Sequence, residues 1–452
     1  MEKGLVSVDR WAEGSQVYFL THLHSDHTQG LSSTWSHGPL YCSPLTAKLL
    51  PFKFPDFNLS LLRILHVHTT SIITLPSTTI LVTALDACHC PGSLMLLFRG
   101  DFGPVLYTGD FRWEPNCHKA TLARNVLCHA LHDIDGVDVV YLDNTYSNPI
   151  YDFPPRHAAT QQIIDIIASH PDHDVIISFN NLGKEDLLVE ISRVLKIKIW
   201  VWPERLRTMH LLGFRDIFTK DTLLTRVRAV PQYSFSIETL EALNRIKCPT
   251  IGIMPSGLPW MKKSLRKSEA KVDNQVGCIG SPEKIHQYIY TVPYSDHSNF
   301  EEMEDFIKLV QPNRLEGIVS SSSCYIEPMY YFGRLCRGNP PMRQLHNRLK
   351  RKESGTRVEA VSGKASFGGV NYESDRGKGK TSRRKFFGVR VSRFGLSRKK
   401  HRGARIQGFA KRKPTIQVRP SLDASSLTVG GEEDDARGVG SGSDLFSLAV
   451  GE

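Results

Sequence analysis

Three histidines and an aspartate lie within residues 21–27, which read T-H-L-H-S-D-H directly after an apolar run. Neutral imidazoles and carboxylates are the ligands that Zn²⁺ and related ions take in proteins. Because side chains alternate at a strand end, His22 and His24 can face one ion. Asp26 and His27 can then face a second ion. Two neighbouring ions could clamp a scissile phosphodiester. The alternative is a set of ordinary histidines, each of which would need its own polar partner.

Two further candidate ligands follow apolar segments later in the chain. His89 lies on a loop after an expected strand at 80–85, where a Pro-Gly turn stops the strand. Asp110 follows an expected strand at 105–107, and the glycine before it permits a close approach of the backbone. Three separate strand ends therefore present His or Asp, as a metal site at the edge of a sheet requires.

Apolar patterns predict the elements that must position these side chains. In the first part of the chain, strands are expected at 5–8, 17–20, 80–85, 94–98 and 105–107. An apolar run lies at 39–42, and one or two helical turns are expected at 44–50. Residues 51–80 show no regular pattern and are expected to be irregular. Further on, expected strands at 175–179, 197–202, 227–230 and 250–254 alternate with expected helices at 156–169, after 183, at 204–212 and at 237–246. Such alternation is typical of a mostly parallel α/β sheet.

Composition narrows the class of protein. A chain of 452 residues with 40% hydrophobic content can bury one large core or two adjacent ones. No segment approaches the roughly 18 apolar residues of a membrane span, so a soluble, unsecreted protein without membrane contact is expected. The nine cysteines show no paired Cys-x-x-Cys spacing, which favours reduced intracellular thiols.

The positive charge is confined to the end of the chain. Residues 341–452 hold 25 Lys and Arg against 11 Asp and Glu, a net charge of +14, whereas residues 1–340 hold 32 against 35, a net charge of −3. Basic runs at 383–385, 398–400 and 411–413, spaced by Gly and Ser, predict a disordered polycation that contacts nucleic acid or carries a nuclear address. A solvated linker without a partner is the alternative.

The ligand series resembles that of the metallo-β-lactamase superfamily. The sequences at 86–93 and 108–112 are similar to its DNA-nuclease branch, the Apollo, Artemis and yeast cross-link repair group, and above all to plant Apollo-like 5′ exonucleases. The resemblance covers roughly residues 1–337. It implies an α/β fold, an αββα sandwich with an inserted β-CASP α/β subdomain and a disordered basic tail. The implied parts are the sandwich at 1–145, the β-CASP cap at 146–290, the return to the sandwich at 291–340 and the tail at 341–452.

The other landmarks of the family can be placed one by one. Asp143 lies in a segment that resembles the acidic motif opening the cap, and His297 lies in one that resembles the motif completing the second metal site. RNA-processing relatives have a histidine at the position of Val319, so this valine favours DNA. The chain departs from the family at Asn299, where Apollo and Artemis have a second serine.

The resemblance also implies roles. It implies two divalent metal ions, with zinc expected and Mg²⁺ or Mn²⁺ possible in one site. The first ion is held by His22, His24, His89 and Asp110, and the second by Asp26, His27, Asp110 and His297. The implied catalytic residues are Asp26, which orients the attacking water, together with Asp110 and His297. Asp9 and Asp143 are expected to accept hydrogen bonds from ligand histidines.

Phosphate contacts are expected at three positions. Lys184 and the turn containing Ser256 follow expected strands, where a positive charge and backbone amides could receive phosphate, and Ser298 follows the last histidine. Lys184 could equally be an ordinary exposed helix residue. Residues 260–287 read as a mobile basic insert that tracks a DNA backbone or simply forms a solvated face.

These observations predict a metal-dependent DNA nuclease. By resemblance it is a 5′-to-3′ exonuclease that acts in the nucleus on single- or double-stranded DNA 5′ ends, in repair of cross-links or double-strand breaks or in telomere-end processing. Repair or telomere proteins would bind through the tail. The alternatives are an RNA-processing or small-ester hydrolase on the same metal centre and a non-catalytic DNA-binding scaffold. The cap and Val319 disfavour the hydrolases, and the intact ligand set disfavours the scaffold.

Overall fold

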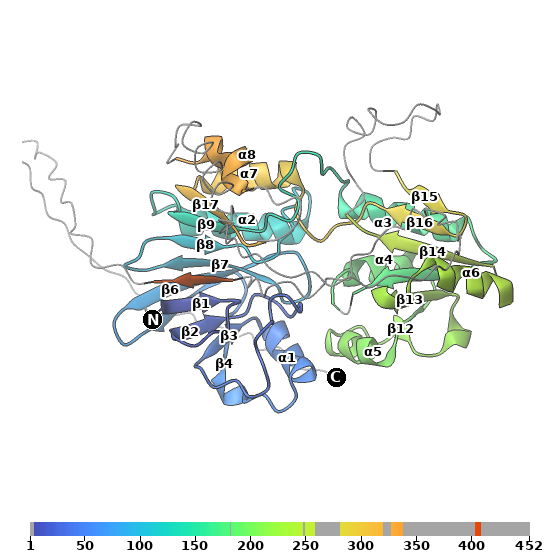
Figure 1. Cartoon of the computed structure of the whole chain (residues 1–452), viewed down its shortest axis with the longest axis horizontal. Helices are drawn as coiled ribbons and strands as arrows, with labels where there is room; N and C mark the ends of the chain where they lie inside the picture. The colour runs from blue at the N-terminus through green and yellow to red at the C-terminus, as the bar shows by residue number, and fades with distance from the viewer. Residues whose placement is uncertain are drawn as a thin grey trace, which may run out of the picture. The chain divides into compact units, whose positions relative to one another are not determined.

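The computed structural model of the chain describes residues 4–180, 182–246, 249–257, 281–319, 327–337 and 403–407 (Figure 1). All of these residues belong to one compact unit. Within the described part of the chain, no helix is long and apolar enough to cross a membrane.

The first sheet has five strands in the order β18-β1-β2-β3-β4. Its strands are β1 (Gly4–Val8), β2 (Ser15–Phe19), β3 (Leu40–Cys42), β4 (Leu62–Ile64) and β18 (Ala404–Ile406). All neighbours are parallel except β18, which pairs antiparallel with β1. Helix α1 (Pro44–Lys53) follows β3, and its N-cap residue Ser43 accepts a hydrogen bond from the backbone N–H of Thr46.

The second sheet has six strands in the order β17-β9-β8-β7-β6-β5. Its strands are β5 (Thr69–Thr74), β6 (Thr79–Asp86), β7 (Leu94–Arg99), β8 (Val105–Tyr107), β9 (Val139–Leu142) and β17 (Arg314–Gly317). Strands β6 and β8 both pair antiparallel with β7, and β8 pairs parallel with β9. The carboxyl ends of β6, β8 and β9 therefore meet at the same edge of the sheet.

The two sheets pack face to face between helices. Along β7, Leu94, Leu96 and Phe98 point into the core shared with the first sheet, while Met95 and Leu97 point to the opposite face. That opposite face is covered by α2 (His118–Leu131), α7 (Phe300–Val310) and α8 (Pro328–Phe332), and α1 lies on the outer side of the first sheet (Figure 1). The layers are those of an αββα sandwich.

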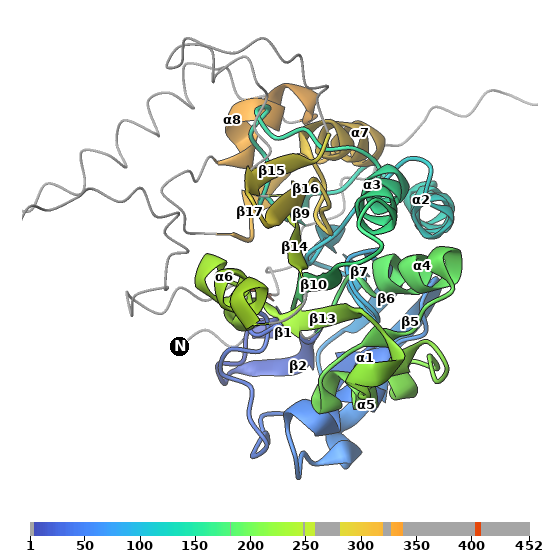
Figure 2. The same cartoon turned by 90° about the vertical axis from the view of Figure 1, so that its right-hand side faces the viewer.

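The third sheet has seven strands in the order β12-β11-β13-β10-β14-β16-β15. Its strands are β10 (Asp174–Phe179), β11 (Ile199–Trp200), β12 (Phe218–Thr219), β13 (Val227–Pro231), β14 (Thr250–Pro255), β15 (Glu283–His286) and β16 (Ile289–Val292). Its helices are α3 (Arg156–Ala168), α4 (Glu185–Leu195), α5 (Pro203–Leu211) and α6 (Ile237–Ile246). Figure 2 shows α6 on one face of the sheet and α3 and α4 on the other. Short 3₁₀ helices lie at Leu59–Leu61, Thr222–Leu224, Gln232–Ser234 and Gly333–Leu335.

The expected alternation of strands and helices in the third sheet is confirmed, and every strand pair is parallel except β15 with β16. The fold class expected from the resemblance is likewise confirmed for the described residues. The division into parts at residues 145, 290 and 340 remains a prediction.

Four local expectations were wrong. Helix α1 has ten residues rather than one or two turns, and residues 51–80 contain β4 and β5. Residues 283–286 of the expected mobile insert form β15, because they complete an antiparallel edge pair with β16. Residues 404–406 of the expected disordered tail form β18, because Ile406 and Ala404 are buried against the sandwich core. The basic runs of the tail and the Lys- and Arg-rich part of the insert lie outside the described residues.

Candidate metal centre

The predicted ligands come from four loops that meet at one edge of the sandwich. The loop carrying His22 and His24 follows β2, His89 follows β6, Asp110 follows β8, and His297 follows β16 of the third sheet. The backbone N–H of Leu94 donates to the carbonyl of Thr21 at 3.1 Å and joins the two sandwich sheets at this point. Segments far apart in the sequence thus bring their polar side chains together.

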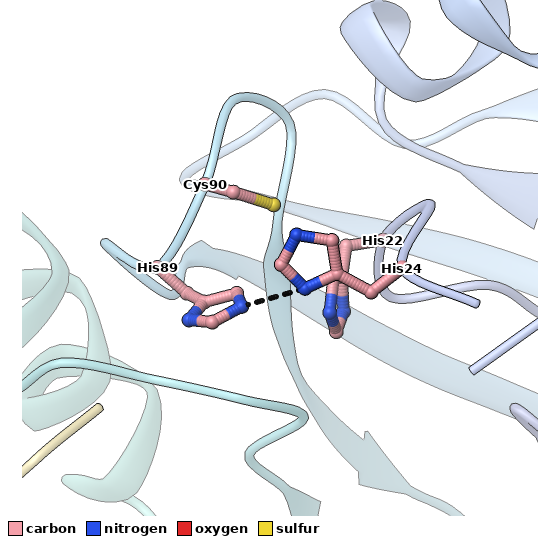
Figure 3. Close-up of side chains that lie close together, drawn as sticks. All are labelled: His22, His24, His89 and Cys90. Atoms are coloured by element: carbon pink, nitrogen blue, oxygen red, sulfur yellow. Dashed lines mark hydrogen bonds between the residues drawn. The ribbon is translucent and has the colours of Figure 1, made fainter. Parts of the chain in front are cut away.

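A first group of ligand atoms consists of His22, His24 and His89 with one oxygen of Asp110. His24 Nδ1 and His89 Nε2 are 3.1 Å apart. Asp110 Oδ2 lies 3.7 Å from His22 Nε2 and 3.8 Å from His89 Nε2. The three rings face one another, with the sulfur of Cys90 close to them (Figure 3). His22 Nε2 is buried and lacks a hydrogen-bond partner, as expected of an atom that is a metal ligand.

The second group that the resemblance implies contains His27 and His297, and ligand atoms of both lie close to those of Asp110. Asp110 Oδ1 is 3.1 Å from His27 Nε2. His297 offers a ligand atom within 4.8 Å of those of His89 and Asp110. Because one of its oxygens faces His22 and His89 and the other faces His27, Asp110 is placed as a carboxylate that bridges two ions would be.

The outward nitrogens of the first-group histidines meet neutral oxygens. His22 Nδ1 lies 3.0 Å from the hydroxyl of Thr21, and His89 Nδ1 lies 2.9 Å from the carbonyl of Asp296. His24 Nε2 lies 3.0 Å from the carbonyl of Leu182. A carbonyl can only accept, so these nitrogens of His24 and His89 carry the proton and leave Nδ1 of His24 and Nε2 of His89 free to bind a metal.

The outward nitrogens of the second-group histidines meet carboxylates instead. His27 Nδ1 lies 2.7 Å from Asp9 Oδ2, and His297 Nδ1 lies 2.7 Å from Asp143 Oδ2. These are the contacts that the sequence analysis expected of Asp9 and Asp143. A carboxylate at this distance orients the ring and makes the opposite nitrogen a stronger ligand.

The sequence of the chain is similar to those of known DNA repair proteins. The profile of the family described as "DNA repair metallo-beta-lactamase" matches residues 214–323. The chain is 39% identical over 331 residues to 5′ exonuclease Apollo of Danio rerio. The aligned region covers 72% of this chain and 52% of the relative. It is 38% identical to 5′ exonuclease Apollo of Gallus gallus, which covers 71% of this chain and 63% of the relative.

A plant relative matches a similar region. The chain is 30% identical over 323 residues to DNA cross-link repair protein SNM1 of Arabidopsis thaliana, which covers 69% of this chain and 62% of the relative. The chain belongs to the DNA repair metallo-β-lactamase family. It spans between about half and two thirds of the length of these relatives.

The charge states of the histidines differ between the two groups of this family site. Burial, reinforced by the neighbouring histidines, lowers the pKa of His22 well below its ordinary value and that of His89 to about 3. Burial also lowers the pKa of His24. For His27 and His297 burial acts in the same direction but is outweighed, by Asp110 and Asp9 for His27 and by Asp143 for His297, so their pKa values are raised.

Asp26 lies outside the clustered ligand atoms, although it is near enough to His24 for its charge to raise the pKa of that imidazole against the effect of burial. Its side chain is exposed on the turn after His24, and its carboxylate is not among the clustered ligand atoms of the described residues. It lies close enough to Lys53 to oppose the effect of burial, which lowers the pKa of that ammonium to about 8. The expected roles of Asp26 as a ligand and as the residue that orients water therefore remain predictions.

Lys184 is not an ordinary exposed helix residue. Its ammonium donates to Asp296 Oδ2 at 2.6 Å, and its side chain is only 16% exposed. Although burial acts in the opposite direction, this ammonium holds the pKa of Asp296 at about 2. Because the carbonyl of Asp296 contacts His89, the pair joins the third sheet to the first group of ligands. Sequence reasoning missed Asp296, although it directly precedes His297.

The other two expected phosphate contacts differ from each other. Ser256 follows β14, and its backbone N–H donates to the carbonyl of Val292 at 3.0 Å. Ser298 is fully buried, accepts a hydrogen bond from the N–H of Trp113 at 2.9 Å and donates to the carbonyl of Phe111 at 3.1 Å. The expected phosphate contact of Ser298 is therefore corrected, because its hydroxyl bridges backbone groups out of reach of a ligand.

A buried arginine, also missed by sequence reasoning, holds the loop of His297. Arg112 is 1% exposed and forms an ion pair with Glu302, with 2.9 Å between Arg112 Nε and Glu302 Oε2. Its guanidinium also donates to the carbonyl of Ser295 at 3.0 Å. Glu302 belongs to the capping box of α7, in which the N-cap residue is Asn299. This residue is therefore used to start a helix.

Proposed function

We propose that this protein is a metal-dependent DNA nuclease that removes nucleotides from 5′ ends. The observation that carries the proposal is the gathering of five imidazoles around the buried Asp110, whose two oxygens face His22, His27 and His89, with each outward ring nitrogen held by an oxygen atom. The named activity of the relatives supports the same reaction.

Two divalent ions fit the ligand atoms. Zinc suits a site of imidazole nitrogens with a carboxylate, and Mg²⁺ or Mn²⁺ is the alternative ion for one of the two sites. The first ion would be held by His22, His24, His89 and Asp110, and the second by Asp26, His27, Asp110 and His297. When bound, such ions activate a water for attack on phosphorus and stabilise the negative charge that develops on the phosphoryl oxygens.

The chain itself contributes orientation and charge. Asp9 and Asp143 keep the Nδ1 protons of His27 and His297 in place, so that Nε2 of each ring faces the site. Asp26, on the exposed turn, is the proposed group that orients the attacking water, with Asp110 and His297 as the other catalytic residues. Lys184 and the backbone around Ser256 are the proposed contacts for the phosphate of a DNA end.

The choice of DNA over RNA has its own support. Val319 lies where the RNA-processing relatives have a histidine, and its N–H donates to the side-chain oxygen of Asn144 at 2.8 Å, next to Asp143. An aliphatic side chain at this position cannot donate to a ribose hydroxyl. Cleavage of RNA or of small esters on the same centre is the competing function.

The cellular setting belongs to the proposal as well. We place the protein in the nucleus, where it would process DNA ends in cross-link or double-strand-break repair or at telomeres. The basic runs of residues 341–452 would bind DNA or repair and telomere proteins.

The test is cleavage of DNA labelled at its 3′ end, with and without a 5′ phosphate, in parallel with RNA of the same sequence. We expect metal-dependent shortening from the 5′ end of DNA, abolished by a chelator and by Asp110→Asn. Asp133→Asn is the matched control, since Asp133 pairs with His132 on the exposed surface.

Three outcomes would contradict the proposal. Equal or faster cleavage of RNA would favour the competing hydrolase. Shortening from the 3′ end would contradict the polarity. Tight DNA binding without cleavage by the metal-loaded protein would favour the non-catalytic scaffold.

A further inference from the structure

Two cysteines lie beside the metal centre without being candidate ligands. Cys88 directly precedes His89 on the loop after β6, and Cys117 is the N-cap residue of α2. Their thiol groups are hydrogen-bonded to each other, and both are free. They are 29 positions apart in the sequence, so the fold alone brings the two thiols together.

One guanidinium holds both cysteines. Arg156, the first residue of α3, donates through Nη1 to the carbonyl of Cys88 at 2.8 Å and through Nη2 to the sulfur of Cys117 at 3.8 Å. Its Nε donates to Glu114 at 2.8 Å, which fixes the direction of the guanidinium. A positive charge therefore lies permanently against the Cys117 sulfur.

The surroundings of Cys117 favour its thiolate. Its sulfur lies at the positive end of a helix of 14 residues. The hydrogen bond from Cys88 and the charge of Arg156 lower the pKa of Cys117 to about 5, although burial acts in the opposite direction. The same hydrogen bond raises the pKa of Cys88 well above its ordinary value, so Cys88 keeps its proton until its sulfur attacks. Its side chain is half-buried, so small oxidants can reach it.

The other cysteines provide a contrast. Burial raises the pKa of Cys42 to about 12 and that of Cys336 to about 11, which keeps both as inert thiols. Cys128 is exposed on α2, the helix that Cys117 caps. Cys117 is therefore the described cysteine best suited to attack an oxidant, and Cys88 is its neighbour.

We propose that Cys117 and Cys88 form an oxidative modification site for peroxides. The thiolate of Cys117 attacks one oxygen of a peroxide, the O–O bond breaks, and the leaving oxygen takes up a proton, which leaves a sulfenic acid on Cys117. The sulfur of Cys88 then attacks that of Cys117, the S–O bond breaks, and the hydroxide leaves as water with the thiol proton of Cys88. With hydrogen peroxide, two thiols become one disulfide and two waters form.

The disulfide would act on the metal centre through the backbone, because Cys88 is bonded directly to the candidate ligand His89. Cys88 has a φ of +55°, in the left-handed region that residues other than glycine rarely adopt, and His89 is the next residue. Drawing the Cys88 sulfur onto Cys117 changes the loop that aims His89. We therefore expect faster release of metal from the oxidised protein. This consequence rests on the proposed function, whereas formation of the disulfide does not.

The experiment exposes the metal-loaded full chain to hydrogen peroxide, alkylates the remaining thiols and identifies peptides by mass spectrometry. We expect a peptide that links Cys88 to Cys117 and is lost on treatment with dithiothreitol. In Cys88→Ser, a sulfenic-acid trap should label Cys117 roughly tenfold faster than Cys128 at pH 7, because Cys117 lies against the Arg156 guanidinium at the start of α2, where its thiolate is favoured. Cys128→Ser, the matched control, should form the disulfide as the natural chain does.

Absence of the linked peptide, or labelling of Cys128 as fast as that of Cys117, would overturn the proposal. Metal release is followed with a chromogenic chelator before and after oxidation. A linked peptide with unchanged metal release would overturn the coupling to His89. A chain that forms the linked peptide but cleaves no nucleic acid would support the modification site and contradict only the proposed nuclease.

Discussion

His22 and His27 both lie against Asp110, but different hydrogen-bond partners shift their pKa values in opposite directions. His22 is held through its outward nitrogen by the hydroxyl of Thr21, whereas His27 is held by the carboxylate of Asp9. A neutral partner leaves burial dominant and favours the neutral imidazole. A carboxylate partner favours the imidazolium. The same contrast separates His89 from His297.

A pH prediction follows from this contrast. Only a neutral imidazole binds a metal, so a histidine with a raised pKa loses its metal at a higher pH than one with a lowered pKa. As the pH falls from 7, His27 and His297 should therefore be protonated first, whereas His89, with a pKa of about 3, should stay neutral. Metal analysis after dialysis at stepped pH should show loss of the second-site ion first. Simultaneous release of both ions would contradict the assignment.

The carboxylates behind the histidines can be tested directly. Asp143→Asn removes the negative charge that holds Nδ1 of His297, and should weaken metal binding at the second site by roughly 10- to 100-fold while the first site changes little. Competition with a chelator of known affinity measures this change. Asp133→Asn, which alters an exposed aspartate beside His132, should leave both affinities unchanged.

The roles expected of Asp26 come from the family resemblance and can be tested by substitution. Asp26→Ala should lower turnover by at least ~100-fold with the fold intact, because it removes the carboxylate that would orient the water and ligate the second ion. Single-turnover cleavage and circular dichroism measure the two quantities. Near-normal turnover in the folded variant would contradict both roles of Asp26, as a ligand of the second ion and as the group that orients the water.

At the scale of elements, the loops of the site are held by buried ion pairs that cross between elements. Arg112 follows β8 and reaches Glu302 on α7, and on the way it contacts the carbonyls of the loop that carries His297. Lys184 at the start of α4 performs a similar task by pairing with Asp296. The position of His297 therefore depends on both the sandwich and the third sheet.

Arg112→Met tests this dependence. Removal of the guanidinium leaves Glu302 buried without its cation, which should destabilise the protein by about 3–5 kcal/mol. Urea unfolding measures the change in the free energy of unfolding. Arg193→Met is the matched control, because Arg193 pairs with Glu190 on the exposed face of α4 and should not shift the midpoint. A small effect of Arg112→Met would mean that the loop of His297 is held by other contacts.

At the scale of the whole molecule, the basic segment after residue 340 is tied to the sandwich at β18. Arg405 on this strand donates to the carbonyls of Ala12 at 2.8 Å and Glu13 at 3.0 Å. Deleting residues 341–452 would therefore remove an edge strand together with the charge. A test of the charge must leave Ala404–Ile406 in place.

We expect the basic runs at 383–385 and 398–400 to supply the salt-sensitive part of DNA affinity. Changing these six residues to Gln should weaken binding at low salt and flatten the plot of log affinity against log salt by up to about 0.9 for each cation that contacts a duplex phosphate. Nuclear accumulation should fall, and the cleavage rate at saturating DNA should stay the same. Equal slopes and unchanged localisation would show that these runs are a passive appendage.

The sequence by itself determined the identity of most candidate ligands and the order of the elements. His22, His24 and His27 stand in one short string, and His89 and Asp110 each follow an apolar strand, so local pattern is enough to find them. The alternation of strands and helices between residues 156 and 254 is equally local, because it reflects which face of each element is buried.

Only the tertiary structure decided which partners these residues have. The ion pair of Lys184 with Asp296 joins residues 112 positions apart, and β18 reaches back to β1 across nearly the whole chain. Ser298 looked like a ligand contact in sequence because a hydroxyl has the same chemistry at the surface as in the core, and only burial shows that the backbone of Phe111 and Trp113 uses it. Pairing, burial and charge state all depend on neighbours that the chain supplies from a distance, which is why they follow from the fold rather than from local spacing.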